Sequence, residues 1–186
     1  MVDVVVKIGG GLLAHSQQFD AVLATIDAVA RDRRLLVVPG GGPFADAVRD
    51  VDGRLKVSAD AAHWMAILAM DQYAHLITSR LSSASLATDR AAIRAALDAA
   101  QLPVLAPFQW MRADDPLPHT WDVTSDSIAA WIAGELGARR LVLVKPPGAG
   151  GTAIVDAYFF RTLPSVVTPV ILAADQQDAL RTELFG

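Results

Sequence analysis

Two apolar segments, each followed by a glycine triplet, constrain the fold of this chain more than any other feature. Val4–Ile8 precedes Gly9–Gly11, and Leu35–Val38 precedes Pro39 and Gly40–Gly42. Continuous apolar runs of this length predict strands that are covered on both faces, as in a parallel sheet. Glycines at the end of such a strand let the backbone approach an anionic ligand closely. A helical pattern follows each triplet, so the sequence predicts strand, glycine turn and helix twice in succession.

The same alternation continues along the rest of the chain. The predicted helices contain or cover Phe19–Val29, Phe44–Val51, Ser58–Leu81, Asp89–Ala100, Thr124–Gly137 and Asp175–Leu184. The predicted later strands are Val104–Ala106, Leu141–Val144 and Val170–Leu172, with a break at Ser82–Ser85, a loop or hairpin at Gln109–His119 and a turn at Pro146–Gly151. Buried strands that alternate with helices predict an α/β fold with a parallel or mixed sheet and helices on both faces. We expect one domain over residues 1–186, because no linker or repeat interrupts the pattern.

Composition excludes several classes of protein. The 186 residues are 53% hydrophobic, with a formal net charge of −4 and no cysteine. The mildly acidic balance argues against a nucleic-acid binder, and the absence of cysteine excludes disulfides and thiolate metal sites. The N-terminal apolar run, Val2–Ile8, contains Asp3 and Lys7 and is too short to span a membrane. We therefore expect a cytoplasmic protein.

Lys7 is the most informative single residue. A lysine inside an apolar strand is costly to bury unless its ammonium group meets an anion or reaches water at the strand end. Lys7 stands two residues before a glycine turn, where it can reach a phosphate. Transfer of a phosphoryl group depends mainly on positioning and charge neutralisation. A solvated lysine above an ordinary turn is the alternative.

A polar segment, Trp121–Ser127, precedes another apolar helical pattern. Thr124 or Ser125 is suited to cap this helix, and Asp126 in its first turn suits the positive end of the helix dipole. Capping leaves Asp122 and the density of polar groups unexplained. A carboxylate at this point is placed to orient one or more lysines around bound phosphates.

Three motifs, taken in order, resemble the amino acid kinase superfamily, which includes acetylglutamate, aspartate, uridylate and isopentenyl phosphate kinases. They are Lys7–Gly11, Val37–Ala45 and Asp122–Asp126. Each motif is weak alone, but the ordered set is specific, and the resemblance extends from Val4 to Asp175. It implies a three-layer αβα sandwich with a mainly parallel central sheet. It also implies that the N-terminal half binds the acceptor and the C-terminal half binds the nucleotide.

The resemblance further implies transfer of the γ-phosphoryl group of ATP to an anionic small molecule, in a homo-oligomer built on a dimer. Lys7 would stabilise the transferring group, Asp126 would orient Lys7, and Asp122 would help to position the acceptor or metal-bound water. The implied phosphate-binding residues are Gly9, Gly10, Gly11, Gly40, Gly41 and Gly42, and the other implied substrate-binding residues are Thr124, Ser125 and His63. Mg²⁺ would be held by ATP oxygens rather than by protein ligands.

One segment departs from the family pattern. Many relatives have a Thr-Asp-Val-Asp-Gly-like stretch after the nucleotide-side strand, whereas Lys145–Gly151 reads Lys-Pro-Pro-Gly-Ala-Gly-Gly. We expect Lys145 to supply a second positive charge to the phosphates, with a surface lysine at a strand end as the alternative. Nucleotide selectivity is left open by this departure.

The short chain and two further stretches, Ala62–Met70 and Val155–Phe159, are similar to the small kinases of methanofuran-type cofactor biosynthesis. Those kinases convert (5-aminomethylfuran-3-yl)methyl phosphate to its diphosphate. On this resemblance His63 and Trp64 lie near the acceptor, although both also fit a buried helix face. Asp156 either meets the cationic amine of the ligand or caps a turn.

Two other functions fit the same sequence. The first is a kinase of another carboxylate or phosphate acceptor, among which an isoprenoid phosphate is disfavoured. Isopentenyl phosphate kinases favour a histidine beside the second glycine turn, where this chain has Pro39 and Pro43–Phe44. The second is a non-catalytic nucleotide- or oxyanion-binding protein with a storage or regulatory role. A storage protein needs neither Lys7 nor Asp126, so the presence of both favours the enzyme.

Overall fold

Six apolar segments form one parallel sheet in the computed structural model, which describes residues 1–149 and 155–185. The strands are β1 (Val4–Ile8), β2 (Leu35–Pro39), β3 (Ala84–Ala87), β4 (Leu102–Leu105), β5 (Arg140–Lys145) and β6 (Thr168–Ala173). Their order across the sheet is β3-β4-β2-β1-β5-β6, and each neighbouring pair is parallel. The predicted α/β fold with a parallel sheet is confirmed.

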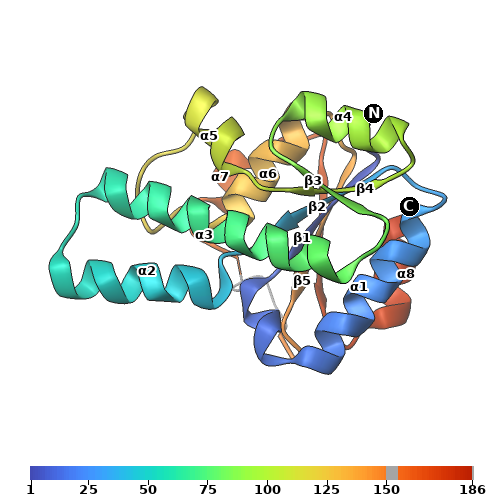
Figure 1. Ribbon diagram of the computed structural model, residues 1–186, viewed down its shortest axis with the longest axis horizontal. Coiled ribbons are helices and arrows are strands. Elements are labelled where there is room, and N and C mark those ends of the chain that lie inside the picture. The colour runs from blue at the N-terminus through green and yellow to red at the C-terminus, as the bar shows by residue number, and fades with distance from the viewer. Residues whose placement is uncertain (150–154, 186) are drawn as a thin grey trace.

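Helices connect the strands and cover both faces of the sheet (Figure 1). The helices are η1 (Gly10–Ala14, a 3₁₀ helix), α1 (Ser16–Ala30), α2 (Gly42–Leu55), α3 (Ala59–Arg80), α4 (Arg90–Asp98), α5 (Phe108–Asp114), α6 (Ser125–Glu135), α7 (Phe159–Thr162) and α8 (Gln177–Phe185). Apolar side chains of α1 and α8 belong to one core cluster, and those of α5, α6 and α7 belong to another. The three-layer αβα arrangement follows from these two cores.

Strand periodicity decides which side chains face α6. On β1, Val4, Val6 and Ile8 pack in the core of α1 and α8, whereas Val5 packs in the core of α6. Successive side chains of a strand point to opposite faces, so Lys7 lies on the α6 face of the sheet. On the neighbouring strand β5, Leu141 and Leu143 pack in the α6 core, so Lys145 lies on that face too. The sheet therefore presents two lysines from adjacent strands to the same helix.

Two local expectations are wrong. The chain after α3 was expected only to break, but Ala84–Ala87 forms the edge strand β3. Its small residues carry little strand signal, and pairing with β4 determines its conformation. The expected loop from Gln109 begins as α5, and Asp115, the residue after this helix, has a left-handed φ of 42°. Pro116 and Pro118, which suggested a loop, follow that end. In the predicted turn after β5, residues 150 and 151 lie outside the described ranges.

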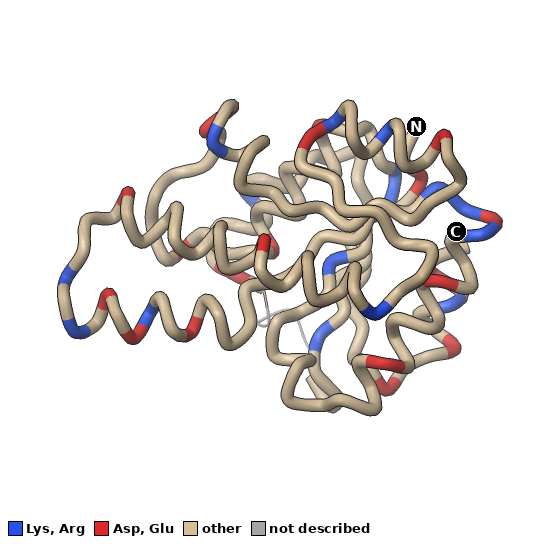
Figure 2. The backbone as a smooth tube through the Cα atoms, in the orientation of Figure 1, with Lys and Arg blue, Asp and Glu red and all other residues tan. Residues whose placement is uncertain are grey.

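The α2–α3 hairpin extends away from the sheet (Figure 1) and forms a wall of the cavity described below. Acidic and basic residues are interspersed along α2, as Figure 2 shows. Within residues 1–149 and 155–185, no helix has the length and apolar character needed to cross a membrane.

Candidate active site

A buried cluster of three charged side chains lies at the carboxyl ends of β1 and β5. Lys7 Nζ lies 2.8 Å from Asp126 Oδ1, and Lys145 Nζ donates a hydrogen bond of 2.6 Å to Asp126 Oδ2. Lys7 and Asp126 are each 4% exposed, and Lys145 is 8% exposed. Asp126 stands in the first turn of α6, so this helix carries the carboxylate to both lysines. The structure thus brings together the three residues expected at the transferring phosphoryl group.

Electrostatics keep Asp126 ionised. Burial alone would raise the pKa of Asp126, but the positive charges of Lys7 and Lys145 outweigh it and hold that pKa below its ordinary value. The pKa of Lys145 is lowered by burial and by the neighbouring charge of Lys7, against the opposing effect of Asp126. One carboxylate serves two ammonium groups, so the cluster keeps an excess positive charge that suits an anionic ligand.

The two glycine turns pack backbone against backbone next to this cluster. A Cβ atom on Gly10 would lie 2.0 Å from the nitrogen of Gly42, and one on Gly40 would lie 2.6 Å from the nitrogen of Gly10. Gly42 also has a φ of +56°, which favours glycine. These contacts explain why side chains are absent from both turns: the turns can only meet if neither has a Cβ.

The six glycines divide into two groups. The Gly9 N–H donates a hydrogen bond to the carbonyl oxygen of Val144, and the Gly40 N–H donates one to the carbonyl oxygen of Ile8. Both bonds are 2.8 Å long. These two N–H groups were expected to donate to phosphate, but in the structure they donate to strand carbonyl groups. The remaining four, Gly10, Gly11, Gly41 and Gly42, line a cavity, and their N–H groups donate to no acceptor among the described residues.

The cavity has a volume of about 520 Å³ and lies between the glycine turns, the α2–α3 hairpin and the segment before α6. Thr124, Ser125 and His63 line it, as expected for substrate-binding residues. Lys7, Asp126 and Lys145 are not among its lining residues; Asp126 follows Ser125 directly and so adjoins the cavity wall. Asp122 is exposed, and its described contact is a backbone one, in which its carbonyl oxygen accepts from the N–H of Tyr158.

Three lining residues that sequence reasoning missed lie together at the cavity. The Arg49 guanidinium is stacked over the Trp121 ring, 4.9 Å from its centroid. The indole N–H of Trp121 donates a hydrogen bond of 2.8 Å to the carboxylate of Asp52. Arg49 and Asp52 come from α2, three residues apart on one helix face, but nothing in the sequence pairs that face with Trp121. The tertiary contact between α2 and the segment before α6 creates this group.

His63 and His119 stack at the same cavity, with ring centroids 4.0 Å apart and planes inclined by 16°. Burial and the nearby charge of His119 lower the pKa of His63 to about 4. Burial opposes protonation of His119 as well, but hydrogen bonds from its two ring nitrogens to Asp60 and Asp115 outweigh this and raise its pKa. The stack therefore pairs a ring that is neutral at pH 7 with a ring on which two carboxylates favour the positive charge.

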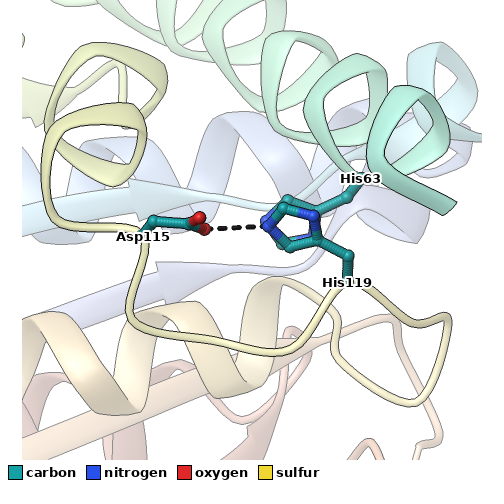
Figure 3. Close-up of side chains that lie close together, drawn as sticks. All are labelled: His63, Asp115 and His119. Atoms are coloured by element: carbon teal, nitrogen blue, oxygen red, sulfur yellow. Dashed lines mark hydrogen bonds and ion pairs between the residues drawn. The ribbon is translucent and has the colours of Figure 1, made fainter.

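Figure 3 shows His63, His119 and Asp115 close together, and their potential ligand atoms lie within 4.8 Å of one another. A metal ion binds in the plane of an imidazole ring, along the lone pair of its nitrogen. Two nearly parallel, stacked rings cannot both place one ion in their planes. Both ring nitrogens of His119 are also engaged by carboxylates. The arrangement is a stacked ion-pair cluster and does not fit a metal centre.

Positive potential at the neighbouring strand ends defines the chemistry of the site. Two ammonium groups, four cavity-lining glycines and the N-terminal ends of α2 and α6 lie at the carboxyl edge of a parallel sheet. Such an edge binds phosphates, and fixed positive groups stabilise the charge on a phosphoryl group in transfer. The fold and the site together define a phosphotransferase.

Comparison with known proteins identifies the family. The model of the amino acid kinase family matches residues 4–146, so the chain belongs to the amino acid kinase family. One relative is the [5-(aminomethyl)furan-3-yl]methyl phosphate kinase of Methanocaldococcus jannaschii, which is 25% identical over 94% of this chain and 85% of its own length. The chain is accordingly a kinase that uses ATP and a small-molecule acceptor.

Solved structures of other kinases share the fold. Uridylate kinase from Archaeoglobus fulgidus superposes with a TM-score of 0.72 at 17% identity, over 98% of this chain and 97% of that one. Aspartate kinase from Synechocystis gives a TM-score of 0.67 at 16% identity, over 94% of this chain and 39% of that one. Both likenesses extend over nearly all of this chain and concern the fold.

Proposed function

We propose that this kinase phosphorylates [5-(aminomethyl)furan-3-yl]methyl phosphate to the corresponding diphosphate. The observation that carries the proposal is the relative with this activity in its name, which aligns with nearly the whole chain. The cavity beside the glycine turns supports it, because about 520 Å³ suits a small ligand rather than a polymer.

The proposed reaction is a direct displacement at phosphorus. An oxygen of the acceptor phosphate forms a bond to the γ-phosphorus of ATP, and the bond from that phosphorus to the β,γ-bridging oxygen breaks to release ADP. The acceptor phosphate is already a nucleophilic anion, so no general base is required of the protein. Lys7 and Lys145 neutralise the transferring group, and Asp126 holds both ammonium groups in place.

The cavity offers complementary groups for each part of the acceptor. The N–H groups of Gly10, Gly11, Gly41 and Gly42 and the hydroxyls of Thr124 and Ser125 are assigned to phosphate oxygens. Trp121 and His63 provide aromatic surface for the furan ring, and His63 stays neutral at pH 7. The carboxylate of Asp52 provides the negative charge that a cationic amine requires. Most of the residues that line the cavity come from the N-terminal half of the chain, so we assign that half of a single domain mainly to the acceptor.

Mg²⁺ is proposed to accompany ATP and to be held by phosphate oxygens. Asp126 does not suit it as a ligand, since its two carboxylate oxygens already contact Lys145 and Lys7 at 2.6 and 2.8 Å. Mg²⁺ commonly binds proteins through substrate phosphates and water, and it neutralises charge on the transferring group. We assign the nucleotide to the C-terminal half, with Lys145 at its phosphates.

ADP release from Mg-ATP tests the proposal directly. The purified chain is incubated with the aminomethylfuran phosphate, its analogue without the amine, uridine monophosphate, acetylglutamate and isopentenyl phosphate. We expect release that depends on the first compound and a diphosphate product in the ³¹P NMR spectrum. Preferential turnover of another acceptor would replace the proposed substrate while keeping the kinase. ATP binding without turnover of any acceptor would favour a binding or storage role.

A cytoplasmic homodimer is the proposed form of the enzyme, because the reaction requires ATP and α3 carries a large aliphatic residue at its surface. Leu68 on α3 is 42% exposed although it is a large aliphatic residue. Light scattering after size exclusion tests this form. A monomer at micromolar concentration would contradict it, and Leu68→Glu should dissociate a dimer that uses this side.

A further inference from the structure

Asp156 makes an unusual number of contacts with the start of α6. Its Oδ2 accepts from the N–H of Thr124 at 3.0 Å, the hydroxyl of Thr124 at 2.8 Å and the N–H of Ser127 at 3.0 Å. Its Oδ1 accepts from the hydroxyl of Ser127 and from the N–H of Tyr158, the latter at 3.1 Å. One half-buried carboxylate therefore receives five donors, four of them from two residues of a single helix start.

The local cap of α6 is weak by comparison. The Thr124 hydroxyl accepts from the N–H of Asp126 at 3.4 Å, the long end of the hydrogen-bond range. The first N–H groups of a helix need acceptors, and negative charge is favoured at this end. Asp156 supplies both from a segment that lies 29 to 32 residues further along the chain. The position of this helix end thus depends on a distant side chain.

The same helix end carries the carboxylate of the active site. Asp126 is the second residue of α6 and lies between the Thr124 and Ser127 donors. We propose that Asp156 is a positioning residue for phosphoryl transfer, which binds the N-terminus of α6 and thereby holds Asp126 between Lys7 and Lys145. This role needs only the kinase activity of the family, and it is independent of which acceptor is used.

The charge of Asp156 gives the proposal a second, separable signature. Burial and Lys7 lower the pKa of Lys145, whereas Asp126 and Asp156 both act to raise it. Removal of the charge of Asp156 should therefore lower the pKa of Lys145 further. Asp89, which caps α4, is not among the charged groups that shift the pKa of Lys145.

The first experiment compares Asp156→Asn with a matched cap variant. Asp89 caps α4 by accepting from the N–H of Ala92 at 2.8 Å, so Asp89→Asn removes the negative charge of a helix cap away from the site. We expect both variants to stay folded, with the smaller loss of thermal stability in Asp89→Asn, because Asp89 accepts one backbone N–H and Asp156 accepts five donors. Only Asp156→Asn should lower kcat, by about 10²-fold, with the KM of ATP and acceptor within a few-fold of wild type. Equal kcat in both variants would reduce Asp156 to a structural cap.

A double-mutant cycle tests whether Asp156 acts through Asp126. If it does, Asp126→Asn combined with Asp156→Asn should have the kcat of Asp126→Asn alone. Multiplication of the two losses would overturn the proposal. Ser127→Ala, which removes one donor to Asp156, is the milder variant should Asp156→Asn fold poorly. It should lower kcat in the same direction by a smaller factor, and unchanged kcat would contradict the proposal.

A final measurement needs no acceptor, so it separates this proposal from the proposed substrate. NMR of lysine labelled at the ε-carbon follows the titration of Lys145 in wild type and in Asp156→Asn. The midpoint should move to lower pH in the variant, because a nearby negative charge has been removed. An unmoved midpoint in a folded variant would overturn the link between Asp156 and the active site. Absence of turnover with every acceptor, together with the moved midpoint, would count only against the proposed substrate.

Discussion

Removal of Asp126 should destabilise the protein, whereas removal of Lys145 should not. The cluster holds two ammonium groups and one carboxylate, all at most 8% exposed. Asp126→Asn leaves two buried positive charges without the carboxylate that both contact, while Lys145→Met leaves the neutral pair of Lys7 and Asp126. The two substitutions therefore change the buried net charge in opposite directions.

The magnitude follows from the two contacts of 2.8 and 2.6 Å. At an effective dielectric constant of about 20, each corresponds to roughly 6 kcal/mol of gross Coulomb attraction. Desolvation of the ions offsets most of this, so the loss of one partner of a buried pair costs about 3–5 kcal/mol. We expect that cost for Asp126→Asn. For Lys145→Met we expect a change within about 1 kcal/mol, because lost attraction is offset by lost repulsion from Lys7 and a smaller desolvation cost.

Urea denaturation at pH 7, followed by circular dichroism, gives the unfolding free energies of wild type and both variants. The pH dependence provides a second check. The pKa of Lys145 in the folded protein is below its ordinary 10.5, so the unfolded chain binds more protons between these values. The unfolding free energy of wild type should rise with pH in that window, and Lys145→Met should lack this contribution. A variant pair with equal losses at pH 7 would refute the reasoning, whatever their activities.

Further predictions concern the stacked histidines, the glycine turns and the phosphoryl-binding lysine. In imidazole NMR titrations His63 should titrate at about 4, because burial disfavours its charged form. His119 should titrate above 6.5, because two carboxylates favour its charged form. Similar midpoints for the two rings would contradict the stack. Gly10→Ala should unfold more easily by about 1–3 kcal/mol and lose turnover, because its Cβ would lie 2.0 Å from a backbone nitrogen. Gly53→Ala is the matched control, with no atom within 4 Å of the new Cβ, and should gain about 0.5–1 kcal/mol in urea denaturation. Lys7→Ala should lower kcat by at least about 10²-fold in the ADP-release assay while remaining folded, and unchanged turnover would remove it from the mechanism.

Much of the fold could be predicted from local pattern. Short apolar runs that end in glycines, such as Val4–Ile8 and Leu35–Val38, predict buried strands, because a strand of a parallel sheet is covered on both faces. The short edge strand Ala84–Ala87 could not be predicted, because it owes its conformation to pairing with β4 rather than to its own residues. Helix α5 was obscured by the prolines that follow it.

The site was partly predictable for the same reason. Lys7, Asp126 and the glycine turns stand out as charged or flexible residues where apolar patterning predicts burial or a turn, and those exceptions are readable in one dimension. The sequence does not show which glycine N–H groups are free to bind phosphate. Only the packed backbone shows that those of Gly9 and Gly40 donate to the ends of neighbouring strands.

The sequence by itself therefore determined the layers of the sheet and the residue types at its carboxyl edge, because periodicity and burial are local properties of the chain. Only the tertiary structure decided that Lys7 and Lys145 share one carboxylate. It also decided that Arg49 lies over Trp121 and that Asp156 binds the start of α6. Each of these contacts joins segments far apart in the sequence, and their spacing carries no periodic signal. Their distances are set by how strands and helices pack, which a single sequence does not display.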